Sequence, residues 1–173
     1  EWVKGKYHGD LDELNRQWWA YFWAHTYTDF AQIDPPNVYG EALVHGLVLD
    51  WRRYVTDLCV EFYRNEIKPL RELTPEVPIT TNLMGTFPKL DYWRLAPHLD
   101  VVSWDSYPPW HGPGGDYDLA CNIAFSHDLN RSLKGGQPFM LMESTPSMTN
   151  WMPLAKRKRP GMHLLASLQA VAH

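Results

Sequence analysis

The sequence predicts an α/β fold in which parallel strands alternate with helices. Apolar or β-branched segments at 77–84, 100–108 and 138–143 have the character of strands, and helical patterns precede, separate and follow them. Strands and helices that alternate at this spacing form parallel βα units. A complete (β/α)₈ barrel takes about 250 residues, whereas this chain has 173 residues. It therefore forms either a small open sheet or one segment of a barrel.

Two helices are expected before the first strand. Asp10 and Glu13 resemble a capping box, and apolar residues follow them at helical spacing. These apolar residues are Leu11, Leu14, Trp18 and Phe22. After a loop at 25–40, residues 42–72 form the clearest helix of the chain, because apolar and charged residues occupy opposite faces with a helical period. Pro69 would bend this helix or end it early.

Helical segments join the predicted strands. Residues 90–99 form a short helical or irregular piece between the first two strands. A helix at 116–133 and the glycine pair Gly135-Gly136 come before the third strand, and a final helix begins at Gly161. Crossovers of this kind bring each strand back parallel to the one before it.

The third predicted strand carries a carboxylate at its carboxyl end. Residues 138–142 are apolar and indicate a buried strand, and Glu143 follows them directly. An ionised glutamate is almost never left unpaired inside a protein, and the catalytic residues of α/β barrels lie at the carboxyl ends of strands. Glu143 is therefore the first candidate for an active-site residue. The alternative is a strand-end glutamate that pairs with an arginine or faces water.

Polar residues also close the other two strands, Asn82 the first and Asp105 with Tyr107 the second. In neighbouring parallel strands these ends share one rim, where Asn82, Tyr107 and Glu143 can converge on a ligand. A hydrogen bond from Tyr107 would keep Glu143 ionised and oriented, as a carboxylate nucleophile requires. Alternatively, Tyr107 anchors the proline turn that follows it, Asn82 caps a loop, and Asp105 serves as a cap or in an ion pair.

The composition argues against several kinds of partner. A net charge of −4 gives no reason to expect nucleic acid, and no apolar stretch approaches the ~20 residues that span a bilayer, so no membrane partner is expected. Cys59 and Cys121 lie far apart in helical patterns, which predicts core packing and neither a zinc site nor a disulfide framework. Nine Trp, nine Tyr and six Phe make 14% of the chain, and flat aromatic faces suit carbohydrate.

Five motifs resemble, in collinear order, those of the β-galactosidases of glycoside hydrolase family 42. The motifs are Trp18–Asp29, His45–Trp51, Thr81–Gly85, Val101–Pro108 and Leu141–Trp151. The resemblance implies a partial (β/α)₈ TIM barrel that contains roughly strands five to seven with their helices. Residues 1–173 would then be a fragment of a single TIM-barrel catalytic domain. A chain that begins with Glu1 and stops at His173 within a helical pattern agrees with this expectation.

The resemblance also implies roles for particular residues. Glu143 matches the nucleophile at the end of the seventh strand, and Tyr107 matches a tyrosine near that nucleophile. Trp151 matches a wall of the galactose pocket, although its indole could instead pack down a loop. Trp23 matches a residue that can reach the active site of a neighbouring subunit in a trimer. Together with Asn82 at the rim, these three aromatic residues are the expected substrate-binding residues.

The resemblance implies no metal in this chain, and an enzyme of this family would hydrolyse terminal β-D-galactosides with retention of configuration and without a cofactor. Its acid/base glutamate follows an asparagine at the end of the fourth strand, which in the family order precedes Glu1. We therefore expect the chain to be inactive alone and to contribute the nucleophile to an intact cytoplasmic enzyme, for which a homotrimer is one assembly. Two alternatives remain, a catalytically inactive carbohydrate-binding barrel and a structural α/β domain without a sugar site.

Overall fold

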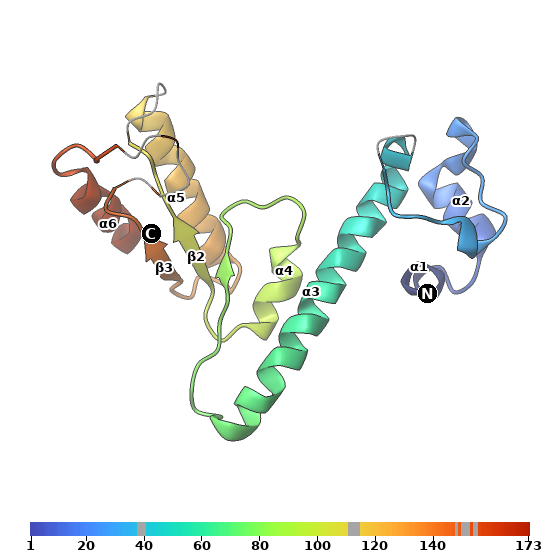
Figure 1. Cartoon of the computed structure of the whole chain (residues 1–173), viewed down its shortest axis with the longest axis horizontal. Coiled ribbons are helices and arrows are strands. Elements are labelled where there is room, and N and C mark those ends of the chain that lie inside the picture. Colours follow the sequence, from blue (N-terminus) through green and yellow to red (C-terminus); the bar gives the residue numbers. More distant parts are fainter. Residues whose placement is uncertain (38–40, 111–114, 148, 150–152, 154–155) are drawn as a thin grey trace. The chain divides into compact units, whose positions relative to one another are not determined.

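The computed structural model (Figure 1) describes the chain in two units. The first unit contains residues 1–65 with 89–91, and the second contains residues 66–88 with 92–173. The described residues are 1–37, 41–110, 115–147, 149, 153 and 156–173.

The first unit is helical. It contains α1 (Trp2–Lys6), α2 (Leu11–Trp18), the 3₁₀ helices η1 (Ala20–Trp23), η2 (Phe30–Gln32) and η3 (Glu41–Leu43), and the start of α3 (His45–Leu73). Helix α2 begins as predicted, because the Asp10 side chain accepts a hydrogen bond from the Glu13 backbone N–H at 2.8 Å. It ends earlier than predicted, because Trp19 adopts a left-handed conformation with φ of 52°. The placement of Phe22 on the same helical face is therefore wrong, and its side chain is 63% exposed.

The side chain of Trp18 lies at the centre of the core of the first unit. Its indole makes edge-to-face contacts with Tyr7 and Tyr27, at ring-centroid distances of 6.2 and 5.8 Å. The other buried members of this core are Leu14, Ala20, Val44 and Leu47. Gly46, in the first turn of α3, approaches Trp18 so closely that a Cβ atom there would lie 2.5 Å from its Cδ1 and 2.7 Å from its Cα.

A buried carboxylate ties α3 to the two helices before it. Asp50 accepts hydrogen bonds from Tyr7 Oη at 2.7 Å, from Trp18 Nε1 at 3.0 Å and from Arg53 at 2.9 Å, and it also pairs with Lys6. Burial opposes the ionised form, but these donors outweigh burial and hold the pKa of Asp50 below its usual value. The carboxylate is thus ionised and paired inside the unit, as a buried charge requires.

Helix α3 agrees with the predicted long amphipathic helix, with two differences. It continues to Leu73, so Pro69 lies inside it and does not end it early. Part of its apolar stripe, including Leu58 and Phe62, is exposed in the described structure. The chain leaves the first unit within this helix, after Asn65.

The second unit is built on a parallel sheet, as the sequence predicts. In the described part of the chain the sheet contains β1 (Asn82–Leu83), β2 (Ser103–Ser106) and β3 (Met140–Ser144), in the order β1-β2-β3. Strand β2 is parallel to both neighbours and pairs Asn82 with Ser103, Trp104 with Leu141, and Asp105 with Glu143. The register shifts between Trp104 and Asp105.

The first strand is shorter than the predicted segment 77–84. Asn82 begins β1, so the prediction that it closes the strand is wrong. The residues before it are held by other hydrogen bonds: Ile79 exchanges bonds with the side chain and backbone of Asp100 at 2.6 and 3.0 Å, and the Thr80 hydroxyl donates to Val101 O at 2.6 Å. A β-branched run therefore adopts an extended conformation here without forming a ladder over its full length.

The third strand is more exposed than its apolar sequence predicts. Met140 is 47% and Met142 43% exposed, so the predicted buried strand is wrong for the structure as described. The reason is that β3, within the described residues, pairs with β2 alone and forms an edge of the sheet. A hollow of about 820 Å³, bordered by Phe139, Leu141 and Val171, lies beside it.

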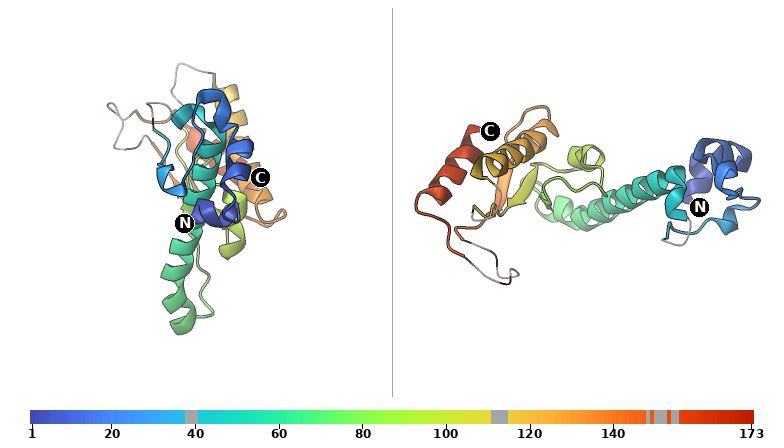
Figure 2. Two further views of the ribbon diagram at one scale, coloured as in Figure 1. Left: turned by 90° about the vertical axis from the view of Figure 1, so that its right-hand side faces the viewer. Right: turned by 90° about the horizontal axis from the view of Figure 1, so that it is seen from above.

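Helices cover the sheet in the positions predicted for them. Between β1 and β2 the chain forms α4 (Tyr92–Leu95) and the 3₁₀ helix η4 (Ala96–His98), α5 (Asp116–Ser132) follows β2, and α6 (Met162–Ala172) follows β3. Helices α5 and α6 lie side by side (Figure 2), and Gln169 Nε2 donates to Ala120 O at 2.8 Å between them. Cys59 is half-buried, whereas Cys121 on α5 is exposed, so the prediction of core packing is wrong for Cys121.

The side chain of His127, a residue of α5, lies between this helix and the sheet and is 1% exposed. Its ring stacks on Phe139 at 5.2 Å and meets the edge of Trp104 at 5.1 Å. Burial, and to a smaller extent the nearby His173, lower the pKa of His127 to about 4, against a small opposing effect of Asp128. The imidazole is therefore neutral at neutral pH.

Substitution of Gly46 by Ala should destabilise the first unit by about 2 kcal/mol or more, because the added Cβ would overlap Trp18. Gly5→Ala is the matched control: it is also helical, has no heavy atom within 4 Å of the added Cβ, and should be neutral or stabilising by up to about 1 kcal/mol. Urea unfolding followed by Trp fluorescence compares the two variants. Equal changes in the free energy of unfolding for the two variants would contradict the close approach of Gly46 to Trp18.

The stability of the protein should fall as the pH drops from about 6.5 to about 4. In this range the unfolded chain binds a proton at His127 and the folded chain does not, because the pKa of His127 is lower in the folded state. His127→Phe removes this difference, so the free energy of unfolding of the wild type should decline by on the order of 2 kcal/mol relative to the variant. The exposed His163 on α6 provides the control, as His163→Phe should retain the wild-type pH dependence.

Candidate active site

One face of the sheet carries polar residues and the other packs against α5. Partners in a parallel ladder point to the same face, and successive residues of a strand point to opposite faces. The pairs Asn82–Ser103 and Asp105–Glu143 therefore share a face, two residues apart along β2. Trp104 points to the other face, where it contacts His127. The sheet thus places Asn82, Asp105 and Glu143 together on the face away from α5.

The carboxylate of Glu143 accepts a short hydrogen bond from the hydroxyl of Tyr107. This contact joins the carboxyl end of β3 to the residue directly after β2. The hydrogen bond to Glu143, followed by burial and the charge of Asp105, raises the pKa of Tyr107 to about 12. Tyr107 therefore remains protonated at neutral pH and can donate. This agrees with the predicted role of Tyr107 as the donor that orients Glu143.

Asp105 lies between this pair and Asn82. Asn82 Nδ2 donates to Asp105 Oδ2 at 2.5 Å, while Asp105 Oδ1 is buried and has no hydrogen-bond partner among the described residues. The sequence interpretation assigned Asp105 only to a cap or an ion pair. Its spacing from Tyr107 could have revealed more, because residues two apart on a strand share a face.

The structure brings together Asn82, Tyr107 and Glu143 among the predicted site residues. Trp151 lies outside the described residues. Trp23 has a described backbone, in η1 of the first unit, but its side chain lies outside what the structure describes. The predicted contributions of both tryptophans to a sugar site stay predictions.

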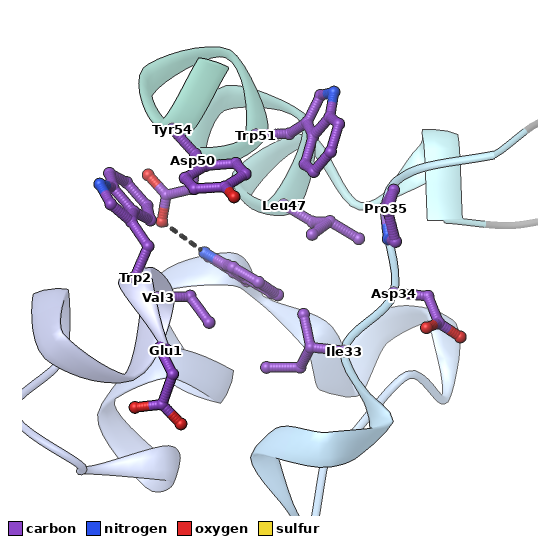
Figure 3. A pocket seen from close by; sticks show the side chains of 11 residues that line it. Glu1, Trp2, Val3, Ile33, Asp34, Pro35, Leu47, Asp50, Trp51 and Tyr54 are labelled. Carbon is purple, nitrogen blue, oxygen red and sulfur yellow. Dashed lines mark hydrogen bonds between the residues drawn. The ribbon is translucent and has the colours of Figure 1, made fainter. Parts of the chain in front are cut away.

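The first unit contains a separate aromatic cavity of about 380 Å³ (Figure 3). Trp2 of α1 and Trp51 and Tyr54 of α3 line it, and the Asp50 carboxylate, with its hydrogen bond from Trp18, borders it. The Asp50 carboxylate is already engaged by its donors within the unit, and the indole N–H of Trp2 donates to Asp57 at 2.8 Å. Glu1 and Asp34 also line the cavity, and its walls are otherwise mainly apolar.

Two features are absent from the residues that the structure describes. No three His, Cys, Asp or Glu side chains among them gather as a metal ligand set. Within the same ranges, no helix combines the length and the apolar character needed to cross a membrane.

The whole chain, residues 1–173, matches the family model for β-galactosidases of glycoside hydrolase family 42. The chain belongs to this family. Family 42 relatives include the β-galactosidase BglY of Alicyclobacillus acidocaldarius, which is 57% identical over 173 residues, and the β-galactosidase Pbg of Clostridium perfringens, which is 51% identical over 176 residues. Both alignments cover 100% of this chain, but only 25% and 26% of the relatives. The chain thus spans about a quarter of their length.

Solved family 42 structures share the fold. The β-galactosidase of Rahnella sp. R3 superposes with a TM-score of 0.94 at 56% identity, over 99% of this chain and 25% of that one. A catalytic mutant of Gan42B from G. stearothermophilus, in which a glutamate is replaced by alanine, superposes with a TM-score of 0.92 at 55% identity, over 99% of this chain and 26% of that one. The α/β fold with a small parallel sheet is therefore that of family 42.

Proposed function

We propose that this chain supplies the nucleophile of a retaining β-galactosidase. The observation that supports the proposal most directly is the hydrogen bond from Tyr107 to Glu143 at the carboxyl ends of neighbouring parallel strands. A carboxylate nucleophile must be ionised and fixed in orientation, and a neutral phenol that donates to one of its oxygens meets both needs. In a chain of family 42, this arrangement favours Glu143 over an ordinary strand-end glutamate.

The proposed reaction has two displacement steps. A carboxylate oxygen of Glu143 attacks C1 of a terminal β-D-galactoside, and the bond from C1 to the leaving oxygen breaks while that oxygen takes a proton from a second carboxyl group. The second group, now a carboxylate, then removes a proton from water, which attacks C1 and releases Glu143. Two inversions at C1 give net retention of configuration.

The second carboxyl group is proposed to come from a part of the intact protein beyond residues 1–173. Asp105 is the nearest carboxylate on the polar face, but it does not suit the task. Its Oδ2 accepts a hydrogen bond from Asn82 and its Oδ1 is buried, so neither oxygen is placed to protonate the leaving oxygen of a substrate. A retaining enzyme also needs room for the sugar between carboxyl groups that stand ~5–5.5 Å apart.

The sugar-binding role is proposed for the residues around Glu143. Asn82 is exposed on the polar face and donates one amide hydrogen to Asp105, which leaves its other polar atoms for the substrate. Trp151 would form a wall of the galactose pocket, and Trp23 would reach the site of a neighbouring subunit in a homotrimer. The assignment of β1, β2 and β3 to barrel strands five to seven, the treatment of residues 1–173 as a fragment of one catalytic domain, and a cytoplasmic location stay predictions from the family resemblance.

Replacement of Glu143 should abolish turnover in the intact protein. Glu143→Gln and Glu143→Gly should each lower kcat by on the order of 10⁴-fold or more, because the covalent intermediate can no longer form. Azide should restore turnover of an activated aryl galactoside by Glu143→Gly, and the product should be the α-galactosyl azide, since azide attacks from the vacated side.

Glu76→Gln, in the exposed turn after α3, is the matched control and should retain the wild-type rate. A Glu143→Gly variant with wild-type turnover would exclude the proposed nucleophile. If the intact parent binds galactose but does not hydrolyse galactosides, and azide restores no hydrolysis by Glu143→Gly, the carbohydrate-binding alternative is favoured.

Loss of the Tyr107 hydroxyl should lower kcat/KM by about 10- to 100-fold. Tyr107→Phe removes the contact that fixes the orientation of the Glu143 carboxylate, and a hydrogen bond to a charged group is worth about 1.5–3 kcal/mol. Steady-state kinetics of the intact protein measure the effect. Tyr117→Phe, on the exposed surface of α5, is the control with the same chemical change and should leave the kinetics unaltered.

A further inference from the structure

A buried carboxylate oxygen next to the Tyr107–Glu143 pair accepts no hydrogen bond from the described residues. Asp105 Oδ1 is buried without a hydrogen-bond partner among the described residues, although Oδ2 of the same group is bound by Asn82 at 2.5 Å. Leaving a buried acceptor unsatisfied costs about 1–3 kcal/mol, and more when the group is charged. An isolated acceptor of this kind in a native site requires an explanation.

The Tyr107 hydroxyl lies near two carboxylates. It donates to Glu143, and the charge of Asp105 also acts on the same hydroxyl. The two carboxylates occupy paired positions on β2 and β3 and point to the same face of the sheet. A phenol has a single proton, so a full hydrogen bond can go to only one of the two carboxylates at a time.

We propose that Asp105 is a positioning residue that receives the Tyr107 hydrogen bond while Glu143 is bonded to the sugar. The inference rests on the proposed function of Glu143. When Glu143 attacks C1 it becomes an ester, loses its negative charge and becomes a weaker acceptor. Asp105 retains its charge, and Tyr107 then donates to the free oxygen Oδ1.

In the second step the hydrogen bond of Tyr107 returns from Asp105 to Glu143. As the bond between C1 and Glu143 breaks, the negative charge returns to Glu143 and the hydrogen bond of Tyr107 returns with it. The O–H bond of Tyr107 stays intact throughout, so no proton is gained or lost and no further reactant is needed. Asn82 occupies Oδ2, and Oδ1 is consequently the oxygen available to Tyr107.

This arrangement has a kinetic consequence for the first step. A carboxylate nucleophile loses reactivity while it accepts a strong hydrogen bond. With Asp105 as a second acceptor, the hydrogen bond of Tyr107 can move away from Glu143 as the bond between Glu143 and C1 forms. Without that acceptor, Tyr107 would stay on Glu143 during the attack. The first step should then be slowed more than the second, because in the second step the retained hydrogen bond stabilises the departing carboxylate.

Asp105→Asn in the intact protein tests the proposal with a substitution of nearly equal shape. We expect kcat/KM for a dinitrophenyl β-galactoside, which needs little acid assistance, to fall about 10-fold. We expect kcat, measured where the second step limits turnover, to fall less than threefold. The acidic limb of the kcat/KM profile, which reports an essential ionised group of the free enzyme, should move to lower pH because a neighbouring negative charge is removed.

Two controls separate this role from a general loss of structure. The burst of dinitrophenolate gives the concentration of active sites, so an unfolded fraction changes the burst and not the normalised rates. Asp100→Asn, three residues before the start of β2, removes a carboxylate that pairs with Arg71 and should leave the pH profile unchanged. If Asp105→Asn cannot be isolated, Asp105→Ser is also neutral and carries the same expectations.

A double-mutant cycle decides whether Asp105 acts through Tyr107. In a Tyr107→Phe background there is no hydroxyl to move, and Asp105→Asn should change kcat/KM less than twofold. The same 10-fold loss in both backgrounds, or an acidic limb that does not move, would overturn the proposal. Failure of the underlying function looks different, since Glu143→Gly would then retain turnover or show no rescue by azide.

Discussion

The hydrogen bond between Tyr107 and Glu143 depends on the parallel pairing of β2 and β3. The two residues lie 36 positions apart in sequence, and helix α5 lies between them. Only a crossover that returns the chain parallel to β2 places both residues at the same end of the sheet. The chemistry proposed for this chain therefore rests on a topological property of the fold, and a helix that never touches the substrate is essential to it.

The same sheet separates two environments. On the face toward α5, Trp104, His127 and Phe139 form a layer in which the imidazole is kept neutral by burial. On the opposite face, carboxylates and a phenol lie next to one another, and Glu143 is exposed. In this unit the site and the core are thus two sides of the same strands.

The sequence predicted the order and type of the elements well, because those depend on local periodicity and on glycine and proline. Helix 116–133 agrees with α5 to within one residue at its end. The sequence predicted burial and strand length poorly, because both depend on which other strands and helices pair with a segment or cover it. The run at 138–142 is apolar, yet β3 lies at an edge, and the run at 77–84 forms a ladder only from Asn82.

In the candidate site, too, the sequence predicts local features but not those that depend on strand pairing. Glu143 and Tyr107 could be selected in advance, because each follows or ends a predicted strand and the family resemblance assigns both a role. The pairing of Asp105 with Glu143 could not be predicted, because it requires the register of the ladder. Local sequence also gave no sign that Trp19 adopts a left-handed conformation, which removed Phe22 from its predicted helical face.

The shift in register between β2 and β3 gives a single residue an unexpected importance. Trp104 pairs with Leu141, but Asp105 pairs with Glu143, so Met142 is an extra residue on β3. In an unbroken ladder Met142 would stand beside Asp105, and the glutamate would pair with Ser106 and point toward α5. One inserted methionine, with no reactive group of its own, thus decides on which side of the sheet the charge emerges.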